Sequence, residues 1–110
     1  MLYQEGIEMI RHICMFQLKE ENKEEHLKMI LEKVQILKDI EQIQSFDVVV
    51  NAKEVSSKNY DLSLIFDFQS IEDLNIYRDH PLHVAFRSFI TPLRDLRACI
   101  DYEFEGCYED

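Results

Sequence analysis

The sequence YRDHPLHVAFRSF, residues 77–89, lies between two helical patterns and decides how the second half of the chain folds. Pro81 lacks a backbone N–H and favours the first turn of a helix, so it predicts a helix that begins there. His80 then lies at the helix boundary and His83 one turn inside, while Tyr77 belongs to the preceding helix. We therefore expect three side chains that can donate, accept or move protons at one junction.

Periodic patterns upstream of this junction predict two strand regions and one long helix. Residues 9–18 alternate as a strand does, and one face of that strand would carry Ile10, His12, Cys14, Phe16 and Leu18. Apolar residues then recur at three- and four-residue spacing, which predicts an amphipathic helix from a capping Asn22 to about Gln42. Two further strands are predicted at residues 46–51 and 60–68.

The remaining elements complete a recognisable order. Ser70 is predicted to cap a short helix that runs to about Arg78, with Asp73 at the reciprocal position of a capping box. The helix from Pro81 would end near Leu93, and the apolar face of a fourth strand would carry Leu96, Ala98, Ile100, Tyr102 and Phe104. The order β-α-β-β-α-α-β is a split βαβ unit, so we predict a ferredoxin-like α+β fold, with a four-stranded antiparallel sheet and helices on one face.

The other face of this sheet would carry Ile13, Met15 and Val49, which are too apolar to remain in water. Two such sheets packed face to face around a twofold axis would form a dimeric α+β barrel. We therefore expect the chain to be its own partner, as a homodimer.

The chain length of 110 residues fits one domain, predicted at 9–104 with tails at 1–8 and 105–110. The codons for residues 4–6 can spell a purine-rich ribosome-binding sequence shortly before Met9. Met9 is therefore predicted to be the translational start.

The charge of the chain argues against large anionic partners. There are 22 acidic and 12 basic residues, a net charge of −10, which repels nucleic acid and anionic membrane surfaces. Only two glycines are present, so no glycine-rich phosphate loop is expected and no nucleotide cofactor is predicted. No metal is predicted either, because the HxxH spacing of His80 and His83 is short for one helix face.

The three cysteines are Cys14, Cys99 and Cys107, an odd number without CxxC spacing. Because Cys14 and Cys99 lie in apolar strand patterns, both are expected to be buried free thiols. Nothing in the sequence resembles a signal peptide or a membrane span. A reducing, cytoplasmic location is therefore predicted.

Residues 77–89, together with the strand YDLSLIFDF at 60–68 and the helix start SIEDL at 70–74, resemble the stress-responsive α/β-barrel (Dabb) family. The resemblance covers essentially Met9 to Glu103. It implies the ferredoxin-like fold and the face-to-face dimer that the residue patterns predict.

One branch of that family is a plant polyketide cyclase that closes a resorcinol carboxylic acid by aldol condensation. The resemblance implies that its catalytic residues correspond to His12, Tyr77 and His83 of this chain. That branch has a further pocket histidine two residues after the tyrosine of the third strand. Here Tyr60 is followed by Asp61 and then Leu62, which is a departure from the cyclase pattern.

These residues predict a pocket within each subunit for a small hydrophobic or aromatic carbonyl compound. We expect His83 to act as a general base and Tyr77 to orient an oxyanion, in chemistry of the cyclase or lyase type. Beside His12, the predicted lining residues are Phe16, Leu62, His80 and Phe86. The alternative is a non-catalytic barrel with a structural or stress-associated role, in which the imidazoles of His12 and His83 satisfy each other or backbone groups.

Overall fold

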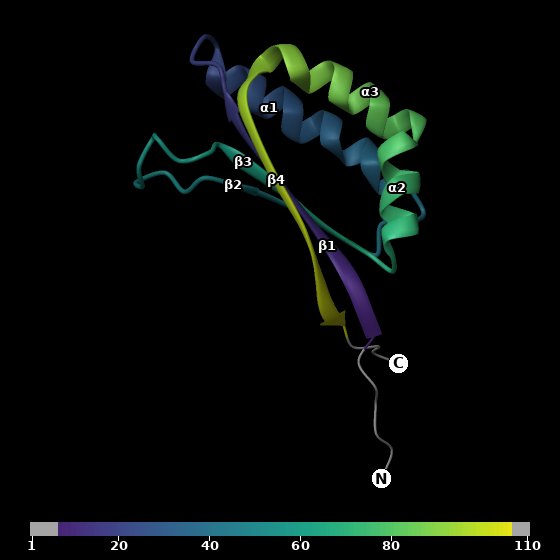
Figure 1. The fold of residues 1–110 in the computed structure, drawn as a ribbon. Coiled ribbons are helices and arrows are strands. Elements are labelled where there is room, and N and C mark those ends of the chain that lie inside the picture. The colour runs from purple at the N-terminus through teal and green to yellow at the C-terminus, as the bar shows by residue number, and fades with distance from the viewer. Residues whose placement is uncertain (1–6, 107–110) are drawn as a thin grey trace.

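The computed structural model describes residues 7–106 and shows one sheet with its helices gathered on a single face (Figure 1). The elements are β1 (Ile7–Leu18), α1 (Lys23–Lys33), the 3₁₀ helix η1 (Val34–Asp39), β2 (Ser45–Val50), β3 (Leu62–Phe68), α2 (Ile71–Asp79), α3 (Pro81–Ile90), the 3₁₀ helix η2 (Thr91–Leu93) and β4 (Arg94–Gly106). The strand order is β2-β3-β1-β4, and neighbouring strands are antiparallel. This is the predicted ferredoxin-like α+β fold.

The central strand β1 pairs with both β3 and β4, so its two faces define the two sides of the molecule. Its predicted inner face is confirmed, because every member is buried beneath the helices: Ile10, His12, Cys14, Phe16 and Leu18. Leu64, Phe66 and Phe68 of β3 extend the same buried layer. The core therefore lies between this face of the sheet and the helices.

The predicted long helix is shorter than expected. α1 ends at Lys33, and η1 follows in its place. Val34, Leu37 and Ile40 are all buried at a three-residue spacing, which fits the three residues per turn of a 3₁₀ helix better than an α-helix. Asn22 does precede α1, but its side chain makes no capping hydrogen bond. Its backbone is left-handed at φ 55°, a conformation that asparagine tolerates.

The other helix boundaries follow the sequence signals closely. The Ser70 hydroxyl accepts a hydrogen bond from the Asp73 amide at 3.1 Å, as predicted for the start of α2. Pro81 occupies the first turn of α3. β1 and β4 are longer than predicted, because Ile7 of β1 still pairs with Gly106 of β4. The rest of the predicted tails, residues 1–6 and 107–110, lies outside the described residues.

No helix within residues 7–106 covers the other face of the sheet (Figure 1). β2 and β4 expose large side chains there, with exposed fractions of 41% for Val49, 52% for Leu96 and 59% for Ile100. The one described charge pair buried on this face joins Arg11 to Asp67 through two hydrogen bonds of 2.8 and 3.0 Å. No helix in the described part of the chain is both long and apolar enough to cross a membrane.

The cysteines differ from the prediction. Cys14 and Cys99 lie directly opposite each other on β1 and β4, with Cα atoms 4.2 Å apart, and they form a disulfide. Cys99 is also exposed rather than buried. The prediction of two buried free thiols is wrong because it treated each strand separately, whereas the pairing register brings the two sulfur atoms together.

Reduction of this disulfide is expected to destabilise the protein. It links residues 85 positions apart, and closing a loop of that length corresponds to about 4–5 kcal/mol in the chain-entropy description. Urea unfolding should therefore show a lower free energy with a thiol reductant, and Cys99→Ser should match the reduced wild type. Cys107→Ser is the matched control. Equal stability with and without reductant would contradict the expectation.

Candidate functional site

A cavity of about 260 Å³ lies between the helix-covered face of the sheet and α3. Its groups that can exchange protons near neutral pH come from three elements, with His12 on β1, Tyr77 on α2 and His83 on α3, and four arginines also line it. Its apolar wall is formed by Cys14, Phe16, Leu64, Phe86 and Ile90. The cavity thus combines an apolar body with a small number of groups that can move protons, as small-molecule sites do.

The structure brings most of the predicted site residues to this cavity. His12, Tyr77, His83, Phe16 and Phe86 all line it. Two predicted lining residues lie elsewhere and require correction. Leu62 is 2% exposed at the start of β3, opposite Phe16 in the register, and belongs to the core outside the cavity wall.

His80 lies at the junction between α2 and α3 and is not part of the cavity wall. Its Nδ1 atom accepts a hydrogen bond from the Leu82 amide at 3.1 Å and so caps α3. Its backbone is extended, at φ −64° and ψ 136°, because the ring of Pro81 disfavours helical geometry in the preceding residue. The role of His80 is to end α2 and start α3, which positions Tyr77 and His83.

The three proton-carrying rings lie together, with Tyr77 adjacent to both imidazoles. Ring centroids are 4.4 Å apart for Tyr77 and His83 and 5.9 Å apart for Tyr77 and His12. Tyr77 is 1% exposed and packs against Phe66 and Phe68. This aromatic packing fixes the tyrosine ring, so its hydroxyl has a defined position relative to both histidines.

His12 is oriented by a carboxylate. Its Nδ1 atom lies 2.5 Å from one oxygen of Asp101, and the other oxygen accepts a hydrogen bond from Arg78 at 2.7 Å. A carboxylate can only accept, so Nδ1 carries the hydrogen and Nε2 is left with the lone pair of the neutral ring. Burial lowers the pKa of His12; the Asp101 carboxylate opposes this shift, and the charges of Arg78 and Arg97 add to it.

His83 is oriented by the backbone. Its Nδ1–H donates to the Arg78 carbonyl at 2.9 Å, which again leaves Nε2 as the acceptor. Burial lowers the pKa of His83, with smaller contributions from the charges of Arg87 and Arg97. Burial raises the pKa of Tyr77, so its phenol stays protonated at neutral pH. The site therefore offers two imidazole acceptors and one phenol donor.

Asp101 and Arg78 belong to this site, but the sequence patterns did not single them out. Asp101 lies on β4 directly opposite His12, on the face that β1 turns toward the helices. The alternation of side chains along β4 could have indicated the position of Asp101. If Ile100 and Tyr102 lie on one face of the sheet, Asp101 lies on the opposite face. Pairing it with His12 requires the register between strands about 90 residues apart.

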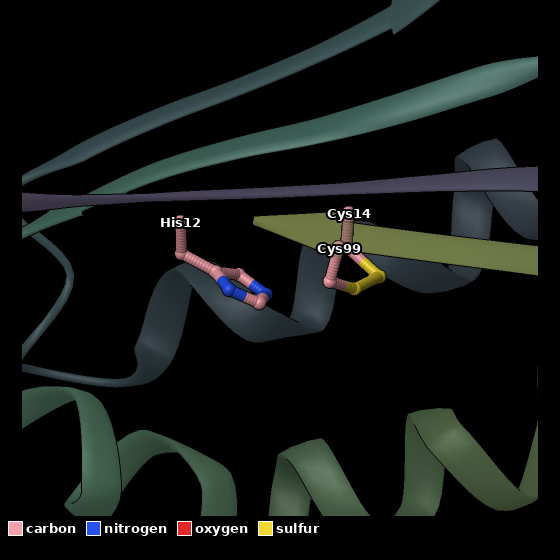
Figure 2. A group of neighbouring side chains, drawn as sticks. All are labelled: His12, Cys14 and Cys99. Carbon is pink, nitrogen blue, oxygen red and sulfur yellow. A yellow bond between two sulfur atoms is a disulfide. The ribbon is translucent and has the colours of Figure 1, made fainter. Parts of the chain in front are cut away.

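His12 also lies beside the cysteine pair (Figure 2). The potential ligand atoms of His12, Cys14 and Cys99 lie within 4.8 Å of one another. Within residues 7–106, these three side chains could therefore hold a metal ion. Two cysteines and one histidine are a known zinc ligand set. Thiolates, however, are the metal ligands, so the pair would have to be reduced before it could bind zinc.

The sequence profile of the stress-responsive A/B barrel domain, Dabb, matches residues 10–104. The chain belongs to this family. None of the curated proteins matches it in sequence. Family membership accounts for the fold, while the chemistry of the site has to be argued from its own residues.

Several solved structures resemble this chain along most of its length. A dimeric protein of unknown function from Bacteroides fragilis is 29% identical, with a TM-score of 0.77 over 93% of this chain and 100% of that one. A Dabb family protein from Mesorhizobium loti is 27% identical, with a TM-score of 0.71 over 89% and 96%. A hydroxynitrile lyase from Passiflora edulis shares the fold, with 14% identity and a TM-score of 0.76 over 92% and 97%.

His12, which is buried, and His83, which is half-buried, should make the Dabb protein less stable in mild acid. Their pKa values are lower in the folded state than the value of about 6.5 expected on unfolding. Their contribution is thus complete above about pH 6.5 and is lost as the pH falls through the folded pKa values. Urea unfolding at constant protein concentration measures the free energy of unfolding at pH 7 and at pH 5. This free energy should fall less between the two pH values in His12→Gln and in His83→Gln than in the wild type. Slopes equal to the wild type would contradict the shifts.

Proposed function

We propose that this Dabb protein binds a small aromatic or otherwise hydrophobic carbonyl compound and catalyses proton transfer next to its carbonyl group, as a lyase or cyclase. The proposal rests on one observation. Two neutral imidazoles, each with Nδ1 already hydrogen-bonded, and one protonated phenol line the same apolar cavity. Such groups perform general acid–base catalysis near neutral pH.

The proposed step is redox-neutral and uses only groups of this chain. The Nε2 atom of His12 removes a proton from the carbon next to the carbonyl; the electron pair of the broken C–H bond forms the C=C bond of an enolate, and the π pair of the carbonyl moves onto its oxygen. The Tyr77 hydroxyl donates a hydrogen bond to the oxygen anion that forms. The imidazolium of His12 then returns its proton to the product, which restores the site.

We assign the base to His12 rather than to His83, the base expected from the sequence. A base becomes positively charged when it takes the proton, and the Asp101 carboxylate at 2.5 Å stabilises that charge directly. Arginine charges disfavour the charged form of both imidazoles, but His83 has only a backbone carbonyl at Nδ1, so no carboxylate stabilises its charged form. His83 is therefore assigned the second acid–base position, on the other side of Tyr77.

The comparisons support lyase chemistry on this fold without naming a substrate. The Passiflora edulis protein of the same fold is a hydroxynitrile lyase. The cyclase pattern is met at His12, Tyr77 and His83, but Leu62 replaces its third pocket histidine and lies away from the cavity. The aldol closure of that branch is therefore not proposed for this chain.

A non-catalytic barrel is the rival function. In that case the imidazoles serve only the fold, through the contacts of His12 with Asp101 and of His83 with the Arg78 carbonyl. The hydroxyl of Tyr77 separates the two functions, because within residues 7–106 it makes no hydrogen bond that would give it a structural role.

Proton abstraction can be tested without the natural substrate. Phenylacetone in D₂O serves as a probe, and NMR measures the exchange of its α-hydrogens. The wild type should accelerate exchange, while His12→Gln should lose roughly 10²–10⁴-fold of that acceleration, the usual share of a general base. Tyr77→Phe should also be slower, because it loses the donor to the oxygen anion.

The stability of Tyr77→Phe is the control for this experiment. Removing a hydroxyl without a partner should change the free energy of unfolding by no more than about 0.5 kcal/mol. A loss of about 1–3 kcal/mol would instead indicate a buried hydrogen bond and favour the structural function. Absence of exchange in the wild type, together with no thermal shift by phenylacetone, would also favour the non-catalytic barrel.

We further propose that the chain forms a homodimer through the open face of the sheet. The relatives from Bacteroides fragilis and Thermobifida fusca are dimeric ferredoxin-like proteins. The same face of this chain exposes Val49, Leu96 and Ile100, and covering them removes apolar surface from water. Two copies packed in this way would form the barrel predicted from the sequence.

A charge placed on the open face should break this dimer. Met15→Asp on β1 should give a monomer or insoluble protein, because the carboxylate would be buried without a partner. Met29→Asp on the outer surface of α1, where the side chain is 43% exposed, is the matched control and should remain dimeric. Light scattering that shows a soluble, unchanged dimer for Met15→Asp would refute the interface.

A cytoplasmic location is part of the proposal, but it has lost one argument. It was predicted from cysteines expected to be free, whereas Cys14 and Cys99 form a disulfide. Disulfides are rare in reducing compartments. Thiol alkylation of protein taken directly from its source would show whether the pair is reduced there, and a fully oxidised pair would count against the cytoplasm.

A further inference from the structure

The arginines of this chain gather at the candidate site. The sequence contains five arginines, and four of them line the one cavity that contains the histidines: Arg78, Arg87, Arg94 and Arg97. They come from α2, α3 and β4, so the fold brings them together from separate segments. In a chain of net charge −10, composition alone does not favour such a gathering.

No carboxylate lining the cavity balances these charges. Among the described residues that line it, none is an aspartate or a glutamate, although the whole chain has 22 acidic residues. Arg78 is paired with Asp101 at 2.7 Å, so its charge is compensated. The other three, Arg87, Arg94 and Arg97, make no ion pair within residues 7–106.

The electrostatic effect of these arginines reaches the reactive groups. Burial is the main cause of the pKa shifts of the three rings; the charge of Arg97 adds to the lowering for His12 and His83, with Arg87 contributing at His83, and partly offsets the rise of the Tyr77 pKa. The site is therefore positively polarised before any ligand enters. An anion would compensate this charge and would also meet guanidinium groups, whose planar N–H donors match carboxylate and phosphate oxygens.

We infer that the ligand of this cavity carries an anionic group, and that Arg87, Arg94 and Arg97 bind it. The ligand class is a small aromatic or aliphatic carboxylate, with its apolar body against Phe16, Phe86 and Ile90. The volume of about 260 Å³ lies below the usual range of ~300–1,000 Å³ for ligand sites, which favours a compact molecule. This inference rests on the proposed function and deepens it, because it names a second recognised group of the substrate besides the carbonyl.

Matched pairs of acid and amide test the inference on the full-length protein. Benzoate with benzamide and cinnamate with cinnamamide have nearly the same shape and differ in charge. By titration calorimetry, each acid should bind at least about 10-fold more tightly than its amide, the effect of a hydrogen bond to a charged group. Phenyl phosphate is titrated as an additional ligand. If it binds more tightly than benzoate, the anionic group of the natural ligand is a phosphate monoester.

Two variants and one control locate the binding. Arg97→Gln on β4 and Arg87→Gln on α3 should each weaken binding of the acids by about 10-fold and leave the amides unchanged. Lys28→Gln removes one positive charge from the exposed surface of α1, away from the cavity, and should change neither. Thermal unfolding of each variant verifies that the fold is intact.

The possible failures are distinguishable. Equal binding of acid and amide, or no binding of any acid at about 10 mM, where even a site with millimolar Kd is filled, would overturn the inference. If neutral phenylacetone still undergoes exchange that depends on His12, the proposed function survives that failure. If acids bind in an arginine-dependent manner but His12→Gln changes no exchange rate, the inference stands and the catalytic proposal fails.

Discussion

The register between β1 and β4 is the constraint on which the site depends. Twelve residue pairs join the two strands, and they place Asp101 opposite His12, Cys99 opposite Cys14 and Arg97 opposite Phe16. Because side chains alternate between the faces of a strand, a slip of one residue would turn all three β4 side chains to the other face of the sheet. The histidine would then lose its carboxylate, and the cavity would lose one of its unpaired arginines.

The second constraint is the reversal between α2 and α3. The ring of Pro81 keeps His80 extended, so α2 ends there and α3 starts in a new direction. The same reversal brings the carbonyl of Arg78, near the end of α2, to the Nδ1 atom of His83 on α3. One junction thus ends a helix, starts another and sets the tautomer of the half-buried His83, while the side chain of Arg78 reaches Asp101 on β4.

Local signals in the sequence predicted the features that depend only on neighbouring residues, such as the buried face of a strand and the start of a helix. The alternation of β1 gave its buried face, Ser70 marked the start of α2, and Pro81 marked the start of α3. The predicted extent of α1 was wrong, because the three-residue spacing of Val34, Leu37 and Ile40 fits a 3₁₀ helix better than an α-helix. Leu62 and His80 were misplaced for a similar reason, since residue type and proximity in sequence do not determine which side of an element faces a cavity.

What the sequence patterns could not supply were contacts between distant segments. The disulfide of Cys14 and Cys99 and the pairing of His12 with Asp101 need a register, and the arginine group needs the packing of α2 and α3 against β4. A long-range arrangement has no signature in composition or in short-range periodicity.

The arginines also change what the net charge means for partners. A charge of −10 spread over the surface repels a long polyanion, whose many phosphates would face many carboxylates at once. A small anion inside a cavity experiences mainly the charges that line the cavity, because exposed charges farther than about 10 Å are largely screened by salt. Those lining charges are arginines without carboxylates. The acidic surface and a cavity for a small carboxylate are therefore compatible, and the acidic surface would itself disfavour larger anionic competitors at the entrance.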